Sequence, residues 1–126
     1  MKFSVCIDAV FYGKDVYESI ELLAKNGIRN IEFWTWWDKD INRLLELKER
    51  YELTYVAFCS KFYSLVDTGE RETYMNGFQE TCETAKKIGC NTIITKPLDK
   101  TGEAYEVQYQ NMRNTLQRCT GIAKKY

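Results

Sequence analysis

The chain contains no histidine among its 126 residues. A Ser-His-Asp relay, a Cys-His relay and a histidine-ligated metal site are therefore excluded within it. Any acid–base chemistry that it performs must come from carboxylates, lysines, tyrosines or cysteines. The glycine-rich dinucleotide loop, the Walker phosphate loop and the HExxH zinc motif are missing as well.

The chain also lacks an excess of either charge. Lys and Arg together number 18, as do Asp and Glu, and the isoelectric point is near 6.3. This balance gives no electrostatic reason to expect a nucleic acid or an anionic membrane as partner. No apolar run approaches the roughly 18 residues of a membrane-spanning helix, so we expect no membrane partner of that kind.

The five cysteines are scattered and never form a CxxC pair. An odd number without paired spacing indicates free thiols rather than a disulfide framework or a zinc site. Free thiols are typical of a reducing compartment, so we expect a cytoplasmic protein.

What the chain does contain is a regular alternation of two patterns. Segments rich in β-branched and aromatic residues, followed each time by a helical spacing of apolar residues, predict strands at residues 3–11, 28–34, 53–59 and 91–97. Four βα units in strict alternation predict a parallel sheet covered by helices in a single domain, residues 1–126.

The ends of the predicted helices carry recognisable signals. Asp15 is the expected N-cap of the first helix, and Asp38 with Asp40 caps the second, which continues to Tyr51. Gly27 and Gly89 follow the first and third helices, in the position that glycine favours. The last helix is expected over residues 105–123.

Two architectures accommodate four parallel βα units: half of a (β/α)8 TIM barrel, or a small doubly wound sheet of flavodoxin type. Doubly wound strands are buried on both faces and read as continuous apolar runs. Residues 31–34 instead alternate Ile31 and Phe33 with Glu32 and Trp34. One apolar and one mixed face is typical of a barrel wall, so the half barrel is the favoured interpretation and the flavodoxin-like sheet the alternative.

Four segments carry a resemblance to a known family. They are "FSVCIDAVF", with Asp8 and Phe11; "AKNGIRNIEFWTWWDKD"; "CSKFYSLVD"; and "YMNGFQETCETAKKIGCNTIIT". In these segments and in the spacing between them, the chain resembles the N-terminal half of the xylose isomerase-like TIM barrel proteins. It is most similar to the hydroxypyruvate isomerase and sugar phosphate isomerase/epimerase branch.

The resemblance implies a divalent metal, Mg, Mn or a similar ion, held by side chains of strands five to eight. It also implies two glutamates there that move a proton between carbons through an enediolate. These strands have no counterpart in the 126 residues, so no catalytic residue, metal ligand or cofactor is assigned within the chain. The related AP-endonuclease branch takes zinc-ligating histidines from strands three and four, so the missing histidine is expected to exclude that branch.

The loops that follow the strands form the mouth of such a barrel, where its chemistry takes place. An aromatic rim there excludes water and presents flat faces to the C–H groups of a sugar. The loops lie at residues 11–14, 34–38, 60–63 and 96–98. The predicted substrate-binding residues are Asp8, Phe11, Glu32, Trp34, Trp37 and Lys96.

Each of these residues has a structural alternative. The aromatic side chains also suit packing between strand and helix. Glu32 is expected to accept a hydrogen bond either from a substrate hydroxyl or from a neighbour such as Lys96. Lys96 is expected either to bind a substrate carboxylate or phosphate, or to pair with Glu32.

Three hypotheses for function follow. The chain is the N-terminal portion of a metal-dependent sugar or hydroxy-keto-acid isomerase or epimerase, supplies substrate-side residues and is inactive alone. Alternatively, it is a half barrel that closes by homo-oligomerisation or with a C-terminal half, because open sheet edges and an open face favour association. A flavodoxin-like binding module is disfavoured, since "DAVFYGKD" has a single glycine where a phosphate-cradling loop needs several small residues.

Overall fold

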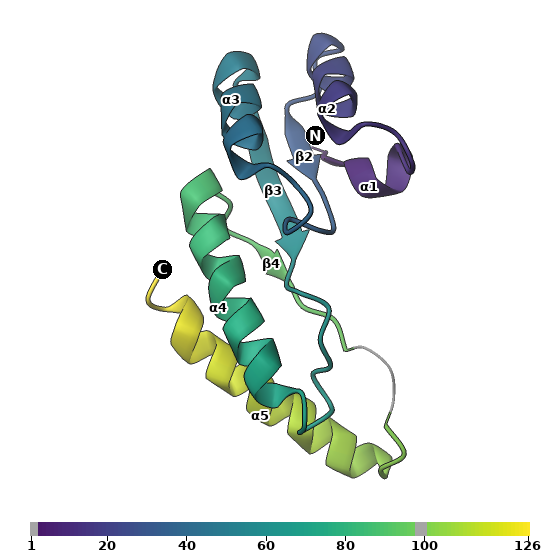
Figure 1. The fold of residues 1–126 in the computed structure, drawn as a ribbon, viewed down its shortest axis with the longest axis vertical. Helices are drawn as coiled ribbons and strands as arrows, with labels where there is room; N and C mark the ends of the chain where they lie inside the picture. Colours follow the sequence, from purple (N-terminus) through teal and green to yellow (C-terminus); the bar gives the residue numbers. More distant parts are fainter. Residues whose placement is uncertain (1–2, 98–100) are drawn as a thin grey trace.

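The computed structural model describes residues 3–97 and 101–126, so Leu98 of the expected loop after the fourth strand lies outside the described residues. Strands and helices alternate along the chain (Figure 1). The strands are β1 (Val5–Cys6), β2 (Asn30–Glu32), β3 (Thr54–Cys59) and β4 (Ile93–Ile94). The helices are α1 (Ile7–Val10), α2 (Val16–Lys25), α3 (Ile41–Tyr51), α4 (Arg71–Ile88) and α5 (Tyr105–Ala123).

The strands form one parallel sheet in the order β1-β2-β3-β4. The long helices follow the same order, since α2 contacts α3, α3 contacts α4, and α4 contacts α5. A flavodoxin-like sheet places β1 inside the sheet, between β2 and β3. Here β1 is an edge strand, so the flavodoxin-like alternative is wrong and the order is that of a barrel wall.

Local signals explain where the helices begin and end. The side chain of Asp15 accepts hydrogen bonds from the backbone N–H groups of Tyr17 and Glu18, both at 2.9 Å, which satisfies donors that a helix start leaves free. Asp40 does the same for α3. Helix α4 ends at Gly89, whose φ of 67° is left-handed and therefore favours glycine.

Two sequence predictions were wrong, one for residues 3–11 and one for Asp38. The expected strand at 3–11 ends at Cys6, and Ile7–Val10 turn into the short helix α1. The Phe11 N–H donates to the Ile7 carbonyl at 2.9 Å, and this helical turn buries the Ile7 side chain. Asp38 is not part of the α3 cap; its carboxylate accepts hydrogen bonds from Thr35 and Lys39.

The expected strand at 91–97 is also shorter than predicted, because only Ile93–Ile94 pair with β3. No described strand pairs with the outer edge of β4. The β1 strand is likewise an edge. Both edges of the four-stranded sheet are therefore open within the part of the chain that the structure describes.

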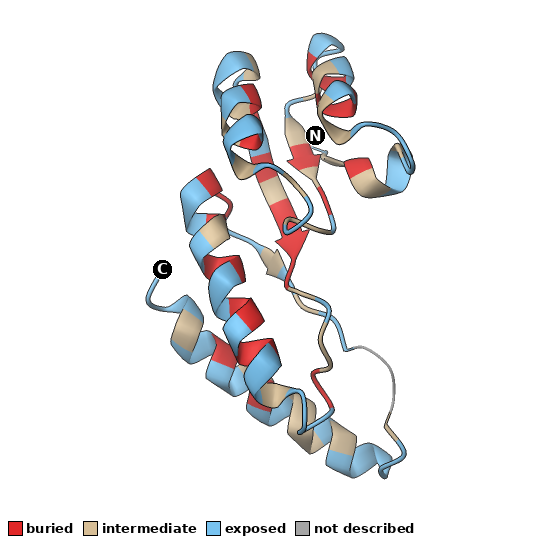
Figure 2. Ribbon diagram, viewed as in Figure 1, coloured by how far each residue is buried: buried red, intermediate tan, exposed pale blue. Residues whose placement is uncertain are grey.

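The core lies between the sheet and the helices, and it has two parts. The larger one centres on β2, β3, α2 and α3, where Phe33 stacks on Phe58 at 5.1 Å between ring centroids and meets the edge of Tyr55. The smaller one joins α4 to α5 through residues such as Tyr74, Phe78 and Cys119. Figure 2 shows buried residues on the sides of these helices that face the rest of the fold.

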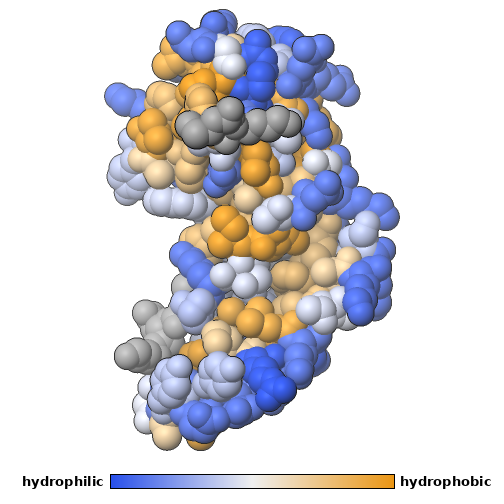
Figure 3. Space-filling view, turned by 180° about the vertical axis from the view of Figure 1, so that it is seen from behind, coloured by the Kyte–Doolittle hydropathy of each residue, from blue (hydrophilic) through white to orange (hydrophobic). Residues whose placement is uncertain are grey.

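None of the helices that the structure describes covers the opposite face of the sheet (Figure 1). Ile31 points into the core and is fully buried, so its neighbours Asn30 and Glu32 point the other way. Asn30 lines a shallow hollow there with Phe3, Ser4 and Val56. Seen from behind, apolar side chains cross the middle of the molecule (Figure 3).

Candidate functional site

The loops after β1 and β2 are joined by the carboxylate of Asp8. Its Oδ2 accepts hydrogen bonds from the backbone N–H of Trp34 at 2.5 Å and of Thr35 at 3.2 Å. Asp8 therefore holds the start of the tryptophan-rich loop in place.

A lysine lies behind this carboxylate. Lys39 Nζ is 3.2 Å from Asp8 Oδ1 and 3.2 Å from Asp38 Oδ1, and it donates to Thr35 Oγ1 at 3.0 Å. Only 4% of the Lys39 side chain is exposed. A buried ammonium group is costly unless it is paired, and here four oxygen atoms of three side chains surround it.

Asp38 completes the cluster at its solvent side. Burial by itself raises the pKa of the Asp38 carboxyl, but the hydrogen bond from Thr35 and the charge of Lys39 outweigh it. The net effect lowers the pKa of Asp38 below its ordinary value. The group is therefore an ionised acceptor at neutral pH, and 56% of its side chain is exposed.

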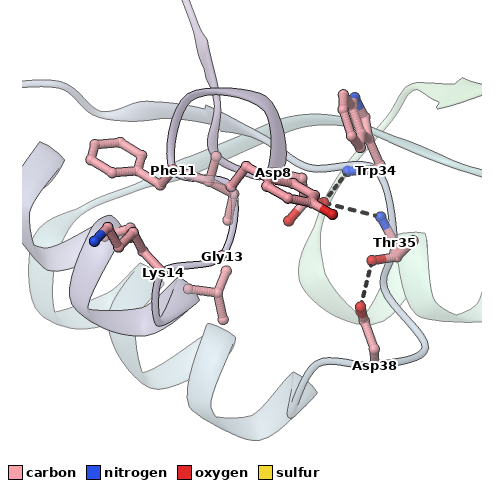
Figure 4. A pocket seen from close by; sticks show the side chains of 11 residues that line it. Asp8, Phe11, Gly13, Lys14, Trp34, Thr35 and Asp38 are labelled. Atoms are coloured by element: carbon pink, nitrogen blue, oxygen red, sulfur yellow. Dashed lines mark hydrogen bonds between the residues drawn. The ribbon is translucent and has the colours of Figure 1, made fainter.

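A hollow of about 190 Å³ lies between the two loops and the start of α2. Three predicted residues, Asp8, Phe11 and Trp34, line it together with Asp38 (Figure 4). Lys14 lies at its lip and extends away from the two carboxylates. The hollow thus combines carboxylate acceptors with aromatic surface, including Trp34, which is 45% exposed.

Two further predicted residues, the aromatic Trp37 and the basic Lys96, form a second group around Phe62. The Trp37 ring meets the Phe62 ring edge to face at 5.1 Å between centroids. Lys96 Nζ lies 3.7 Å from the centroid of the same Phe62 ring, which is cation–π geometry. Trp37, Phe62 and Lys96 follow β2, β3 and β4 respectively, so loops from three strands meet here.

Trp36 anchors the tryptophan-rich loop to the helix layer. Its indole Nε1 donates to Thr81 Oγ1 at 3.2 Å, and Thr81, in α4, is fully buried. Lys61 Nζ lies 5.4 Å from the Trp36 ring centroid and pairs with Glu80. The structural alternative for these aromatics therefore applies to Trp36, while Trp34 and Trp37 remain substantially exposed.

Glu32 belongs to neither group. Its carboxylate accepts a hydrogen bond from Ser4 Oγ on the open face of the sheet. Within residues 3–97 and 101–126, Lys96 makes no ion pair with a carboxylate. The alternative in which Glu32 pairs with Lys96 is therefore wrong, and a substrate role for Glu32 stays a prediction.

The residues present do not suit a metal ion. In the part of the chain that the structure describes, no three His, Cys, Asp or Glu side chains come together as ligands would. All five cysteines are free thiols. A metal like that of the resembling isomerases therefore fits no cluster of the described residues. No described helix is long and apolar enough to cross a membrane.

Comparison with known proteins was informative at the level of structure. No protein-family model and no curated protein sequence matches the chain. Among solved structures, AP endonuclease family 2 from Brucella melitensis superposes with a TM-score of 0.89 at 14% identity, over 99% of this chain and 52% of that one. The IolI protein with a bound zinc atom gives 0.83 at 20%, over 100% and 49%. A sugar phosphate isomerase/epimerase from Parabacteroides distasonis gives 0.75 at 12%, over 98% and 50%.

The fold is half of a TIM barrel. The half-barrel prediction is thereby confirmed, and the chain spans about half the length of the solved barrels that it matches. At such low identity the likeness is one of fold. It therefore does not test the prediction, drawn from the missing histidine, that sets the chain apart from the endonuclease branch.

The predicted set of site residues omits Asp38 and Phe62, and sequence reasoning gave no role to Lys39. Lys39 lies between Asp38 and Asp40 and reads as part of a solvated helix cap. Nothing in that local pattern shows that its side chain turns back to Asp8, 31 residues earlier. A chemical signal did exist, since Asp8 is a carboxylate at the end of an apolar strand, where burial requires a partner.

Proposed function

We propose that the chain forms the substrate-side half of the mouth of a sugar or hydroxy-keto-acid isomerase or epimerase. The observation that carries the proposal is the meeting of Trp37, Phe62 and Lys96 from three consecutive strand-end loops. Functional groups of barrel enzymes lie at this end of the strands. If these aromatic residues served only to pack each loop against the helix that follows it, side chains from three different loops would not need to meet.

The chemistry of the two groups suits a small polar substrate of the hydroxypyruvate or keto-sugar type. Aromatic faces pack on C–H groups and exclude water, and the Asp38 carboxylate accepts hydrogen bonds from hydroxyl groups. The exposed Lys96 ammonium, with no carboxylate paired to it among the described residues, is placed for a substrate carboxylate or phosphate. Glu32, on the open face, would meet substrate from the inside of a closed barrel.

This proposal gives the 126 residues no catalytic base and no metal ligand. A divalent metal and the proton-transferring groups of such an enzyme would belong to another half barrel, as the N-terminal position suggested by the resemblance implies. When bound, the metal would polarise the substrate carbonyl. We expect the assembled enzyme to work in the cytoplasm, where the five thiols stay reduced.

The test is a titration of tryptophan fluorescence with hydroxypyruvate, fructose and fructose 6-phosphate. All three tryptophans of the chain lie in the loop after β2, so their emission reports on this site alone. Lys96→Met should weaken binding of the anionic ligands about tenfold, as loss of one charge-assisted contact implies. Lys124→Met, near the C-terminus, is the control. No response to any ligand, or equal effects of the two substitutions, contradicts the proposal.

A second candidate is a half barrel that closes with another copy of itself. The open edges of β1 and β4 and the uncovered sheet face favour it. In a closed pair, β1 of one protomer would lie beside β4 of its partner, as neighbouring strands do in a full barrel. The zero net charge of the chain offers no repulsion between copies.

Sedimentation equilibrium over a hundredfold dilution range tests this candidate. A closed pair has about twice the 14.9 kDa of the chain. Val56→Lys, on the open face, should dissociate it, whereas Leu22→Lys, an exposed apolar residue of α2, should not. A monomer at all concentrations refutes self-pairing and leaves a separate C-terminal half as the partner.

A further inference from the structure

Lys39 is buried to an extent that lysine rarely reaches. Lysine side chains are almost never fully buried unless they are paired. Only 4% of the Lys39 side chain is exposed. Its ammonium group has three N–H donors, and three side chains, Asp8, Asp38 and Thr35, accept from it at 3.0 to 3.3 Å. Every donor of Lys39 is therefore used inside the protein.

These contacts connect the two loops that carry the aromatic residues. Asp8 belongs to α1 after β1, whereas Thr35 and Asp38 lie in the loop after β2, on either side of Trp36 and Trp37. The same Asp8 carboxylate accepts from the backbone N–H of Trp34 and Thr35. Lys39 thus neutralises the carboxylate that holds the loop backbone, and it also contacts Thr35 and Asp38 within that loop.

We infer that Lys39 is a positioning residue for the mouth of the barrel. By holding Asp8 and Asp38 on either side of Thr35, it sets the loop from which Trp34 and Trp37 present their rings. The functional meaning of this role rests on the proposed function, because a rim matters only if substrate packs against it. The structural part of the inference stands on the contacts alone.

Charge and shape both matter at this position. Without the ammonium group, two carboxylates face each other with no counter-charge, and the partly buried Asp8 gains by turning to solvent. That rotation releases the backbone N–H groups of Trp34 and Thr35. An arginine keeps the charge but replaces three tetrahedral donors by a flat fork, so it can serve the two carboxylates but fits the hydroxyl of Thr35 poorly.

A purely stabilising ion pair is the competing explanation. It predicts that loss of Lys39 lowers the free energy of unfolding while the folded loop keeps its geometry. A positioning role predicts a change in the folded state itself. Because the three tryptophans all lie in this loop, near-UV circular dichroism and acrylamide quenching measure the loop without added probes. Trp36 and Trp37 lie edge to face at 6.0 Å, an arrangement on which the near-UV signal depends.

The experiment compares Lys39→Met, Lys39→Arg, Asp8→Asn and wild type at a temperature where far-UV circular dichroism shows each of them folded. Lys25→Met is the matched control, since Lys25 makes an exposed ion pair with Glu21 on α2. Lys39→Met and Asp8→Asn should both reduce the near-UV signal and raise the quenching constant, and Lys39→Arg should retain part of the wild-type signal. Lys25→Met should change neither.

Ligand titration supplies the functional readout. Where wild type binds hydroxypyruvate or fructose, Lys39→Met should weaken binding about tenfold with no change in the groups that touch the ligand. If wild type binds neither, the proposed function fails while the spectroscopic result still decides the inference. Wild-type near-UV signal and quenching in both folded Lys39→Met and folded Asp8→Asn overturn it. Should Lys39→Met fail to fold, Asp8→Asn and Lys39→Arg decide on the same criteria.

Discussion

The hydrogen bond between Trp36 and Thr81 allows a sharp test of how the tryptophan-rich loop is attached. The indole Nε1 donates to Thr81 Oγ1 at 3.2 Å, and the same hydroxyl donates to the Gly77 carbonyl at 2.6 Å. Thr81 is fully buried. Replacing it by valine keeps the shape of the side chain but removes the acceptor of the indole N–H.

The magnitude follows from leaving a donor without a partner. A polar group that loses its buried partner costs about 1–3 kcal/mol. Trp36 is only partly buried, so Thr81→Val should lower the free energy of unfolding by about 1–2 kcal/mol, near the low end of that range. In a Trp36→Phe background the indole donor is absent, and the same substitution should cost only what loss of the hydrogen bond from Thr81 Oγ1 to the Gly77 carbonyl costs. The expected coupling energy is therefore about 1 kcal/mol or more.

The assay is urea unfolding followed by far-UV circular dichroism, because Trp36→Phe alters fluorescence directly. Wild type, both single variants and the double variant form the cycle. Thr81→Ser is the control: it keeps the acceptor and loses a methyl group, so its cost, about 1 kcal/mol from cavity formation, should be the same in both backgrounds. Equal costs of Thr81→Val with and without the indole would refute the reasoning.

Three further predictions concern titration and backbone geometry. The pKa of Asp38 is lowered in the folded state, so its ionised form stabilises the fold and this contribution disappears as pH falls through the folded pKa. Asp38→Asn should therefore flatten the loss of stability below about pH 4 in acid titrations. Burial raises the pKa of Cys119 to about 11, so mass spectrometry should find this thiol unalkylated in native protein at roughly pH 8 and modified after unfolding. Gly89→Ala should cost about 1–2 kcal/mol for its left-handed backbone, and more than Gly27→Ala in urea unfolding. A Cβ at Gly89 would lie 2.7 Å from Lys48 Nζ, whereas one at Gly27 meets open space.

The substrate-side residues show where prediction from the sequence succeeds and where it stops. Asp8, Phe11 and Trp34 were predicted together because each lies at or near the end of an expected strand, and they do line one hollow. Trp37 and Lys96 were predicted for the same mouth, but they meet each other through Phe62 instead. Position at a strand end specifies which end of the sheet a residue occupies. It does not specify which of its neighbours a long side chain reaches.

The first strand illustrates the limit for secondary structure. Residues 3–11 have a strongly β-rich composition, and only tertiary contacts convert Ile7–Val10 into a helical turn. Two contributions outweigh the preference of these residues for a strand: burial of the Ile7 side chain, and the hydrogen bonds that Asp8 accepts from two backbone N–H groups. The preference is small, since β propensity differs among residues by only about 1 kcal/mol.

The sequence by itself determined the alternation of four βα units, the caps at Asp15 and Asp40, and the half-barrel class. All of these depend on interactions within a few residues or on the period of apolar side chains. The tertiary structure alone decided that Lys39 is buried against Asp8 and that Glu32 accepts from Ser4. Those contacts join residues 28 and 31 positions apart, and they exist only because parallel pairing of β1 with β2 places the ends of the two strands side by side.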